Sequence, residues 1–100
     1  MDYQVVFSPS ARKDLREIVR YISSDAPKRA VGFGQFLLSK TKYLPQNPNM
    51  GRMVPEFRDP NIREIVVKRY RIIYRVDSAK QKIKIVRIWH SARMNPVLPA

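Results

Sequence analysis

Residues 63–93 carry three apolar runs, which read Arg63-Glu64-Ile65-Val66-Val67, Tyr70-Arg71-Ile72-Ile73-Tyr74-Arg75-Val76 and Ile83-Lys84-Ile85-Val86-Arg87-Ile88-Trp89-His90-Ser91-Ala92-Arg93. Cations alternate there with β-branched and aromatic residues, a period of two that is typical of β-strands. The runs predict three strands, at about 62–67, 69–77 and 82–90, with a turn within 77–81. The alternation also predicts a row of arginines on one face of the sheet and an apolar opposite face, so the basic face suits an anionic partner.

The first quarter of the chain predicts a strand that leads into a helix. Residues 3–7 are apolar and extended in character. Ser8 is suited to cap a helix, and Pro9 is suited to its first turn. Apolar residues then recur with the helical period, so the first helix is expected over Pro9–Ser23.

A second helix is expected after a short joint at residues 24–27. Its apolar stripe runs from Ala30 to Leu44, and Pro45 ends the pattern. Gly32 and Gly34 lower helix propensity, and we expect them to permit close packing of this helix against its neighbour.

These elements predict an α+β fold of the order β-α-α-β-β-β. A helix hairpin is expected to cover one face of a small, mainly antiparallel sheet and to leave the other face open. The irregular stretch 45–61 is long enough to be functional or mobile. The apolar tail 97–100 is expected to be frayed or docked on a partner.

Composition limits both the architecture and the partners. The chain of 100 residues is 44% apolar, enough for one domain spanning 1–100. Twenty Lys and Arg against eight Asp and Glu give a net charge of +12, which favours nucleic acid or an acidic protein as partner. The absence of cysteine and the single histidine argue against disulfides, a metal site or another cofactor. No membrane span or secretory signal is predicted, so we expect a cytoplasmic protein.

Five motifs in order resemble toxins of the RelE/ParE superfamily, also labelled plasmid stabilisation proteins. They are Ser8-Pro9-x-Ala11, Gly51-Arg52-x-Val54-Pro55-Glu56, Arg63-Glu64, Tyr70-Arg71-Ile72-Ile73-Tyr74 and Trp89-His90-x-x-Arg93. The resemblance implies a type II toxin that an acidic antitoxin holds inactive in a hetero-oligomer. RelE-like members cut mRNA on the ribosome, whereas ParE-like members poison DNA gyrase without settled catalytic residues. The chain looks slightly more ParE-like, and the alternative is a metal-independent, ribosome-dependent endoribonuclease.

The nuclease alternative rests on Glu56, Arg71 and His90. Cleavage by a 2'-hydroxyl needs a base, a cation at the phosphorane and an acid, and these residues suit the three roles in that order. They match the Glu, Arg and His of YoeB-like toxins by position, but the tyrosine that follows the histidine there is Ser91 here.

Strand geometry offers a test of this trio. A four-residue loop over 78–81 pairs Arg71 with Ile88 and leaves His90 on the diagonal, within reach of one phosphate. A five-residue loop places Arg71 and His90 on opposite faces unless a bulge intervenes. The structural alternatives are a locally hydrogen-bonded His90 and a Glu56 that pairs with Arg52, Arg58 or Arg63.

Further arginines are candidates for contacts with phosphates or with an acidic antitoxin, namely Arg63, Arg69, Arg75, Arg87 and Arg93. A solvated charged face is the structural alternative. Tyr70, Tyr74 and Trp89 alternate with these cations, so we interpret them as core residues rather than as platforms for stacked bases.

Overall fold

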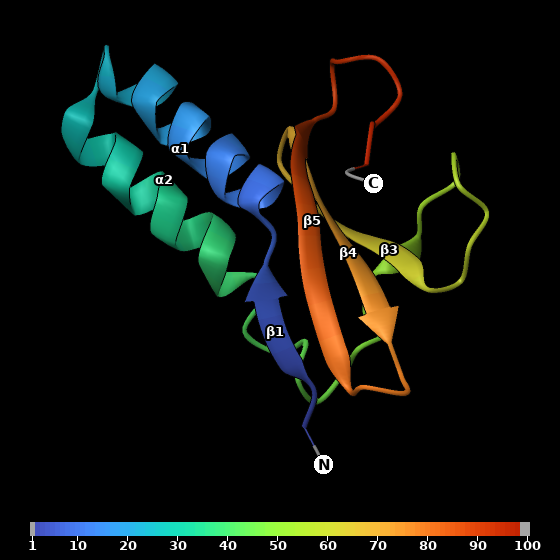
Figure 1. The fold of residues 1–100 in the computed structure, drawn as a ribbon. Helices are drawn as coiled ribbons and strands as arrows, with labels where there is room; N and C mark the ends of the chain where they lie inside the picture. The colour runs from blue at the N-terminus through green and yellow to red at the C-terminus, as the bar shows by residue number, and fades with distance from the viewer. Residues whose placement is uncertain (1, 99–100) are drawn as a thin grey trace.

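Two helices pack against a five-stranded mixed sheet in the computed structural model, which describes residues 2–98 (Figure 1). The elements are β1 (Gln4–Phe7), α1 (Pro9–Ser23), α2 (Pro27–Ser39), β2 (Arg52–Met53), β3 (Ile62–Val67), β4 (Tyr70–Asp77) and β5 (Lys82–His90). The strand order is β1-β5-β4-β3-β2, and only β1 runs parallel to its neighbour. The predicted α+β fold and mainly antiparallel sheet are therefore confirmed. The short strand β2 lies within the stretch that was predicted to be irregular.

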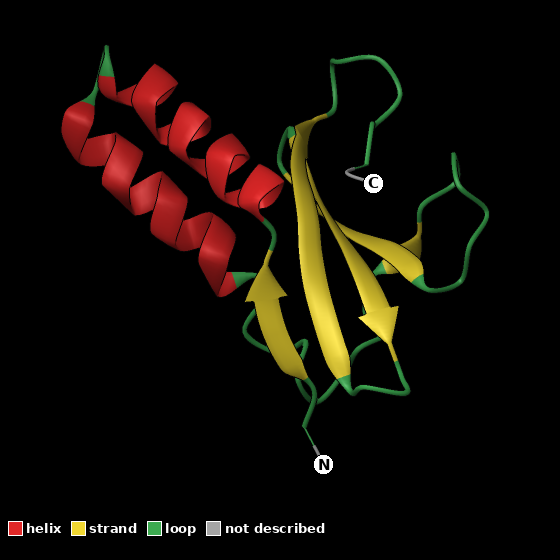
Figure 2. Ribbon diagram, viewed as in Figure 1, coloured by secondary structure: helices red, strands yellow, loops and turns green. Residues whose placement is uncertain are grey.

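Ser8 joins the start of α1 to β5, an interior strand of the sheet. Its Oγ accepts a hydrogen bond from the Ala11 amide at 3.0 Å, as an N-cap does, and donates one to the Val86 carbonyl at 3.0 Å. Pro9 occupies the first turn, as predicted. In Figure 2 the antiparallel hairpin of α1 and α2 lies along one side of the sheet and extends beyond it. Neither helix is long and apolar enough to cross a membrane.

Helix α2 ends at Ser39, earlier than the predicted stop before Pro45. The amides of Lys40, Thr41 and Lys42 bond to carbonyls three residues back, so the chain tightens into turns. The hydroxyls of Ser39 and Thr41 also bond to carbonyls of the preceding turn, which favours this ending. Leu44 still reaches the core and is fully buried. The apolar stripe therefore continues past the end of α2 at Ser39, as far as Leu44.

The two glycines of α2 differ in their surroundings. An added Cβ at Gly34 would lie 3.1 Å from Cγ2 of Val19, so Gly34 permits close packing of the two helices as predicted. An added Cβ at Gly32 would meet nothing within 4 Å. The prediction is therefore wrong for Gly32, which lies at an exposed position of the helix.

The helix-covered face of the sheet carries the larger core. Its fully buried members come from both helices, the turn after α2 and the last two strands, and include Ala11, Leu37, Leu44, Ile72, Tyr74, Ile83 and Ile85. Tyr74 also ties the 45–51 segment to the sheet, because its hydroxyl donates to the Pro48 carbonyl at 2.8 Å and accepts from the Gly51 amide at 2.9 Å.

The far face of the sheet, opposite the helices, is not open as predicted. A second core of Val54, Ile62, Ile73, Val86 and Trp89 lies there. The loop that follows β2 and the C-terminal tail cover it, with Phe57 and Leu98 packed against it (Figure 1). The tail thus docks on its own chain as far as Leu98, and the remainder of the predicted apolar tail, Pro99 and Ala100, lies outside the described residues.

A β-bulge at Val86 changes the pairing of β4 and β5. The turn has the four loop residues 78–81, and Asp77 pairs with Lys82 and Tyr74 with Ile85. Beyond the shift at Ile73/Tyr74, Ile73 pairs with Arg87, so Val86 is the additional residue on β5. Arg71 consequently lies opposite Trp89, and the predicted pairing of Arg71 with Ile88 is wrong.

Candidate functional site

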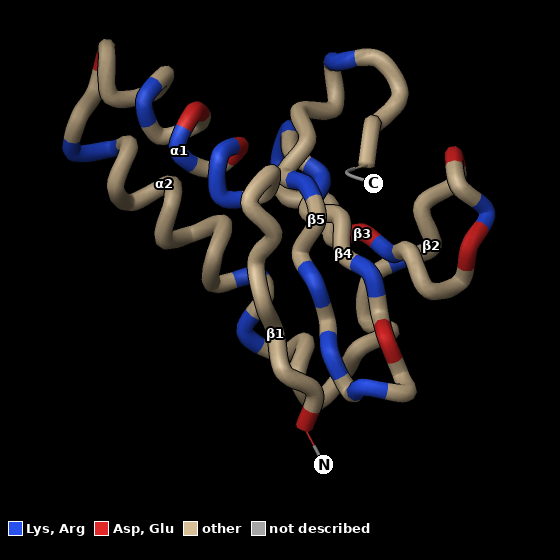
Figure 3. The backbone as a smooth tube through the Cα atoms, in the orientation of Figure 1, with Lys and Arg blue, Asp and Glu red and all other residues tan. Residues whose placement is uncertain are grey.

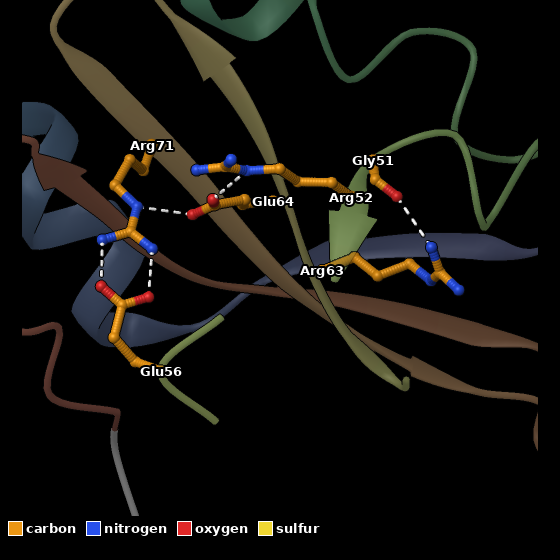
Figure 4. Close-up of polar contacts among 6 residues, drawn as sticks. All are labelled: Gly51, Arg52, Glu56, Arg63, Glu64 and Arg71. Carbon is orange, nitrogen blue, oxygen red and sulfur yellow. Dashed lines mark hydrogen bonds and ion pairs between the residues drawn. The ribbon is translucent and has the colours of Figure 1, made fainter. Parts of the chain in front are cut away.

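Arg71 is the centre of an ion-pair cluster on the far face (Figure 4). Its Nε donates to Oε1 of Glu64 at 2.5 Å, and its Nη1 and Nη2 donate to the two oxygens of Glu56 at 2.9 and 2.7 Å. All three nitrogens therefore already donate to carboxylates. The bidentate bond links the loop that carries Glu56 to the middle of the sheet.

Glu64 is the buried residue of this cluster, and it was not among the predicted site residues. Its side chain is 0% exposed, and its second oxygen accepts from Nε of Arg52 at 2.6 Å. A buried carboxylate is stable only when it is paired and hydrogen-bonded, and Glu64 meets this condition through arginines of β2 and β4. A glutamate in the middle of a β-branched strand was the sequence signal for it.

The two partners of the bidentate bond influence each other's protonation. The hydrogen bonds from Arg71 hold the pKa of Glu56 below its ordinary value, and the bonds to Glu56 raise the pKa of Arg71. A general base works best with a pKa near the operating pH. Glu56 is thus ionised, weakly basic and occupied by its partner. The sequence alternatives paired it with other arginines, whereas the structure pairs it with Arg71.

His90 lies on the opposite face of the sheet from this cluster. Because of the bulge, it pairs with Tyr70, and the two rings make an edge-to-face contact with centroids 5.1 Å apart. Its Nδ1 accepts from the Ala92 amide at 3.1 Å, which is the local hydrogen bond of the structural alternative. An acceptor Nδ1 leaves Nε2 to carry the proton of the neutral ring.

The structure therefore brings two of the three nuclease candidates together and not the third. Glu56 and Arg71 are in direct contact on the far face. His90 projects toward the helix-covered face, where Tyr70 belongs to the periphery of the larger core. The sheet itself separates the imidazole from the guanidinium.

His90 lines a hollow of about 300 Å³ between α1 and the end of β5, hereafter the His90 hollow. Its walls combine aromatic and aliphatic groups with charges of both signs, and they include Tyr21, Tyr70, His90 and Arg93 together with the acids Asp14 and Glu17. Tyr21 is 79% exposed, and burial raises the pKa of the Tyr70 hydroxyl. A surface of tyrosine, arginine and apolar groups resembles the composition of protein-protein interfaces.

The five predicted arginines do not form one row. Arg63 lies on the side of Ile65 and donates to the Pro60 carbonyl. It also donates to the Gly51 carbonyl (Figure 4). Arg69 is in the turn between β3 and β4, and Arg75 is exposed on the far face. Within residues 2–98 neither Arg69 nor Arg75 makes an ion pair.

The other two arginines, Arg87 and Arg93, lie over Trp89, with 4.7 and 4.0 Å from the guanidinium carbon to the ring centroid. Trp89 is itself buried, in agreement with its interpretation as a core residue. Arg87 is also paired with Asp14 of α1 at 2.8 Å and donates to the Val97 carbonyl. It is therefore held at the junction of helix, strand and tail.

Asp14 is a second buried acid that the sequence did not single out. One of its oxygens accepts from both the Ile88 amide and Nε of Arg87. Helix α1 thereby supplies a hydrogen-bond acceptor for the backbone of β5 beyond the point where β1 ends. Among residues 2–98 there is no group of three His, Asp or Glu side chains placed to hold a metal ion.

The fold is similar to those of solved toxins. The chromosomal ParDE TA system from P. aeruginosa gives a TM-score of 0.74 at 23% identity, over 88% of this chain and 95% of that chain. The toxin-antitoxin complex RelBE2 from Mycobacterium tuberculosis gives a TM-score of 0.59 at 23% identity, over 90% of this chain and 99% of that chain. A mutant of E. coli toxin RelE in the free state gives a TM-score of 0.65 at 17% identity, over 92% of this chain and 86% of that chain. At these identities the likenesses show the fold alone.

The family comparison extends over nearly the whole chain. A comparison with curated proteins gave no match. Residues 5–95 match the family described as the ParE toxin of type II toxin-antitoxin system, parDE. The chain therefore belongs to the ParE toxin family of type II toxin-antitoxin systems.

Proposed function

We propose that this toxin poisons DNA gyrase, as ParE-like toxins do, and that it acts by binding its target rather than by cleaving RNA. The match of residues 5–95 to the ParE toxin family is the observation that carries the proposal. In this proposal the toxin inhibits growth when it is not bound to its antitoxin.

The positions of the ionisable groups support a binding mechanism. An RNA-cleaving centre needs a base, a cation and an acid around one phosphate. Here Arg71 is occupied by Glu56 and Glu64, and His90 lies across the sheet from them. The bulge in β5 places the imidazole and the guanidinium on opposite faces, because Arg71 pairs with Trp89 and His90 with Tyr70.

We assign the contact with the target to the His90 hollow. Tyrosine and arginine supply much of the binding energy in protein interfaces, and Tyr21 and Arg93 are both exposed here. In this assignment His90 and Arg93 bind the target and have no role in chemistry.

An acidic antitoxin is the proposed regulator. The net charge of +12 favours an acidic partner, and two of the similar structures are a ParDE system and a RelBE2 toxin-antitoxin complex. Arg69, which makes no ion pair within residues 2–98, is available for such a partner.

Inducible expression in bacteria tests the target. Cells that express the wild-type toxin are expected to accumulate broken DNA that is covalently linked to gyrase, while their translated messages stay intact. Messages cleaved within their coding regions, with no gyrase-linked breaks, would refute the proposal and establish the nuclease instead.

Two exposed tyrosines provide a matched pair of variants for the assigned surface. Tyr21 is 79% exposed and lines the His90 hollow, whereas Tyr43 is 59% exposed and lies elsewhere. Tyr21→Ala is expected to weaken gyrase inhibition about tenfold or more, as loss of an interface anchor does, and Tyr43→Ala to leave it unchanged. Equal activity of both variants and wild type would place the contact elsewhere.

A further inference from the structure

A basic hollow lies on the far face at the turn end of β4 and β5, away from the His90 hollow. It measures about 270 Å³ and is lined by Val6, Arg75, Asp77, Lys80, Lys82 and Lys84, hereafter the hairpin hollow. In Figure 3 blue segments mark this end of β5 and the turn, with a red segment on β4. Strands β4 and β5 and the turn between them thus present four cations and one acid, and the neighbouring strand β1 contributes Val6.

The pairing of β4 and β5 forces like charges together in this hollow. Arg75 pairs directly with Lys84 in the antiparallel ladder. Side chains that are directly opposite have Cβ atoms about 4.5–5.5 Å apart, and like charges at that separation are destabilising. Both side chains are on exposed positions of the far face, so neither is held there by the core.

The chain itself supplies little to neutralise this charge. Asp77 pairs with Lys82 in the ladder, and one of its oxygens already accepts from the Lys80 amide at 3.1 Å. None of the four cations forms an ion pair within residues 2–98, whereas Arg52, Arg71 and Arg87 all do. The hollow is therefore a concentrated, unneutralised positive site.

We propose that the hairpin hollow binds the phosphodiester backbone of nucleic acid, with Arg75, Lys80, Lys82 and Lys84 contacting phosphates. Three of the four cations are lysines, which bind phosphate as point charges and leave the base sequence unread. Among residues 2–98, no aromatic or amide side chain lines the hollow, so no described side chain there is placed to stack on a base or to read its edge.

An acidic protein fits this site less well than a phosphate backbone does. Protein interfaces are depleted in lysine and centred on apolar or aromatic anchors. Within the described part of the chain, Val6 is the one apolar residue that lines the hollow, and the exposed Tyr21 and Tyr43 lie outside it. This inference goes beyond the proposed function, because it holds whichever enzyme the toxin inhibits.

The test is the salt dependence of binding to labelled duplex DNA of arbitrary sequence, measured by fluorescence anisotropy between about 50 and 200 mM salt. The variant replaces Arg75, Lys80, Lys82 and Lys84 with Gln. The control replaces an equal number of exposed cations on α1, namely Arg12, Lys13, Arg16 and Arg20, with Gln. Both proteins have the same net charge, so a difference between them reports position rather than total charge.

Each lost phosphate contact reduces the slope of log affinity against log salt by about 0.9, so four contacts reduce it by about 3.6. Over the fourfold rise in salt the wild type is then expected to lose roughly 150-fold more affinity than the hairpin variant. The α1 control is expected to keep the wild-type slope.

Three results would overturn the proposal. They are an unchanged slope in the hairpin variant, an equal reduction in the α1 control, and stronger competition by polyglutamate than by unlabelled DNA at equal charge. The same titration with single-stranded RNA distinguishes the source of the phosphates, since its slope per contact is about 0.7. Binding of either polymer that depends on the four cations supports the site.

Discussion

Arg71→Leu is expected to cost more stability than any other single change in the ion-pair cluster. The carboxylate of Glu64 is 0% exposed and has two partners, Nε of Arg71 at 2.5 Å and Nε of Arg52 at 2.6 Å. The Arg52 side chain is 62% exposed and remains after the substitution. The variant thus leaves the buried carboxylate of Glu64 with a single partner, the largely exposed Arg52.

The size of the loss follows from this geometry. Removing one partner of a buried ion pair costs about 3–5 kcal/mol, and the retained Arg52 bond favours the lower end, about 3 kcal/mol. For a domain of this size such a loss lowers the Tm by roughly 12–24 °C. The bond from Arg71 to the more exposed Glu56 adds less than about 1 kcal/mol.

Urea unfolding at pH 7, followed by circular dichroism, measures the loss. The double variant Arg71→Leu/Glu64→Leu removes the buried charge as well and is expected to be more stable than Arg71→Leu alone. A single-variant loss below about 1 kcal/mol, or a double-variant loss equal to the sum of the two single losses, would refute the reasoning. The outcome also bears on tests of toxicity, because an Arg71 variant that does not fold is inactive for a structural reason.

Four further predictions concern stability. Gly32→Ala is expected to raise the free energy of unfolding by about 0.5–1 kcal/mol in urea titrations, because the exposed helical site has room for a Cβ. Gly51→Ala is expected to lower the free energy of unfolding, because the added Cβ would lie 2.5 Å from a carbonyl oxygen of β3. Equal urea midpoints for the two glycine variants would contradict both predictions. Because its partner holds the pKa of Glu56 below the ordinary value of 4.5, the stability from that carboxylate is present above pH 4.5 and is lost as the pH falls through the folded value. Glu56→Gln is therefore expected to flatten the fall of the urea midpoint in acid, and an unchanged profile would exclude this contribution. Lys84→Thr removes the repulsion with Arg75 and is expected to raise stability by roughly 0.2–1 kcal/mol, whereas a lower Tm would show that the two cations do not repel.

Local periodicity predicted most of the elements. The alternation in residues 62–90 located three strands, and the capping signal at Ser8-Pro9 located the start of α1. Of the two loop lengths considered, the structure has the four-residue loop at 78–81. These features depend on neighbouring residues, whose preferences the sequence displays directly.

The candidate site was less predictable, because its members meet through tertiary contacts. The positions of Glu56 and Arg71 were noted from a resemblance, but their bidentate bond depends on how the loop after β2 folds over the far face. Glu64 was overlooked because a charged residue in a strand is usually solvated. Its burial follows from the loop and from arginines on both neighbouring strands.

The sequence by itself determined the order of all elements except β2, the basic charge and the period of the three strands between residues 62 and 90. Only the tertiary structure decided which face His90 occupies. The bulge at Val86 lies where α1 meets β5: Ser8 bonds to the Val86 carbonyl, and Asp14 accepts from the Ile88 amide. These partners are separated by 78 and 74 residues, so no local pattern contains the information. One additional residue in a strand reverses every side chain beyond it, and this is the physical reason why Arg71 and His90 lie on opposite faces of the sheet.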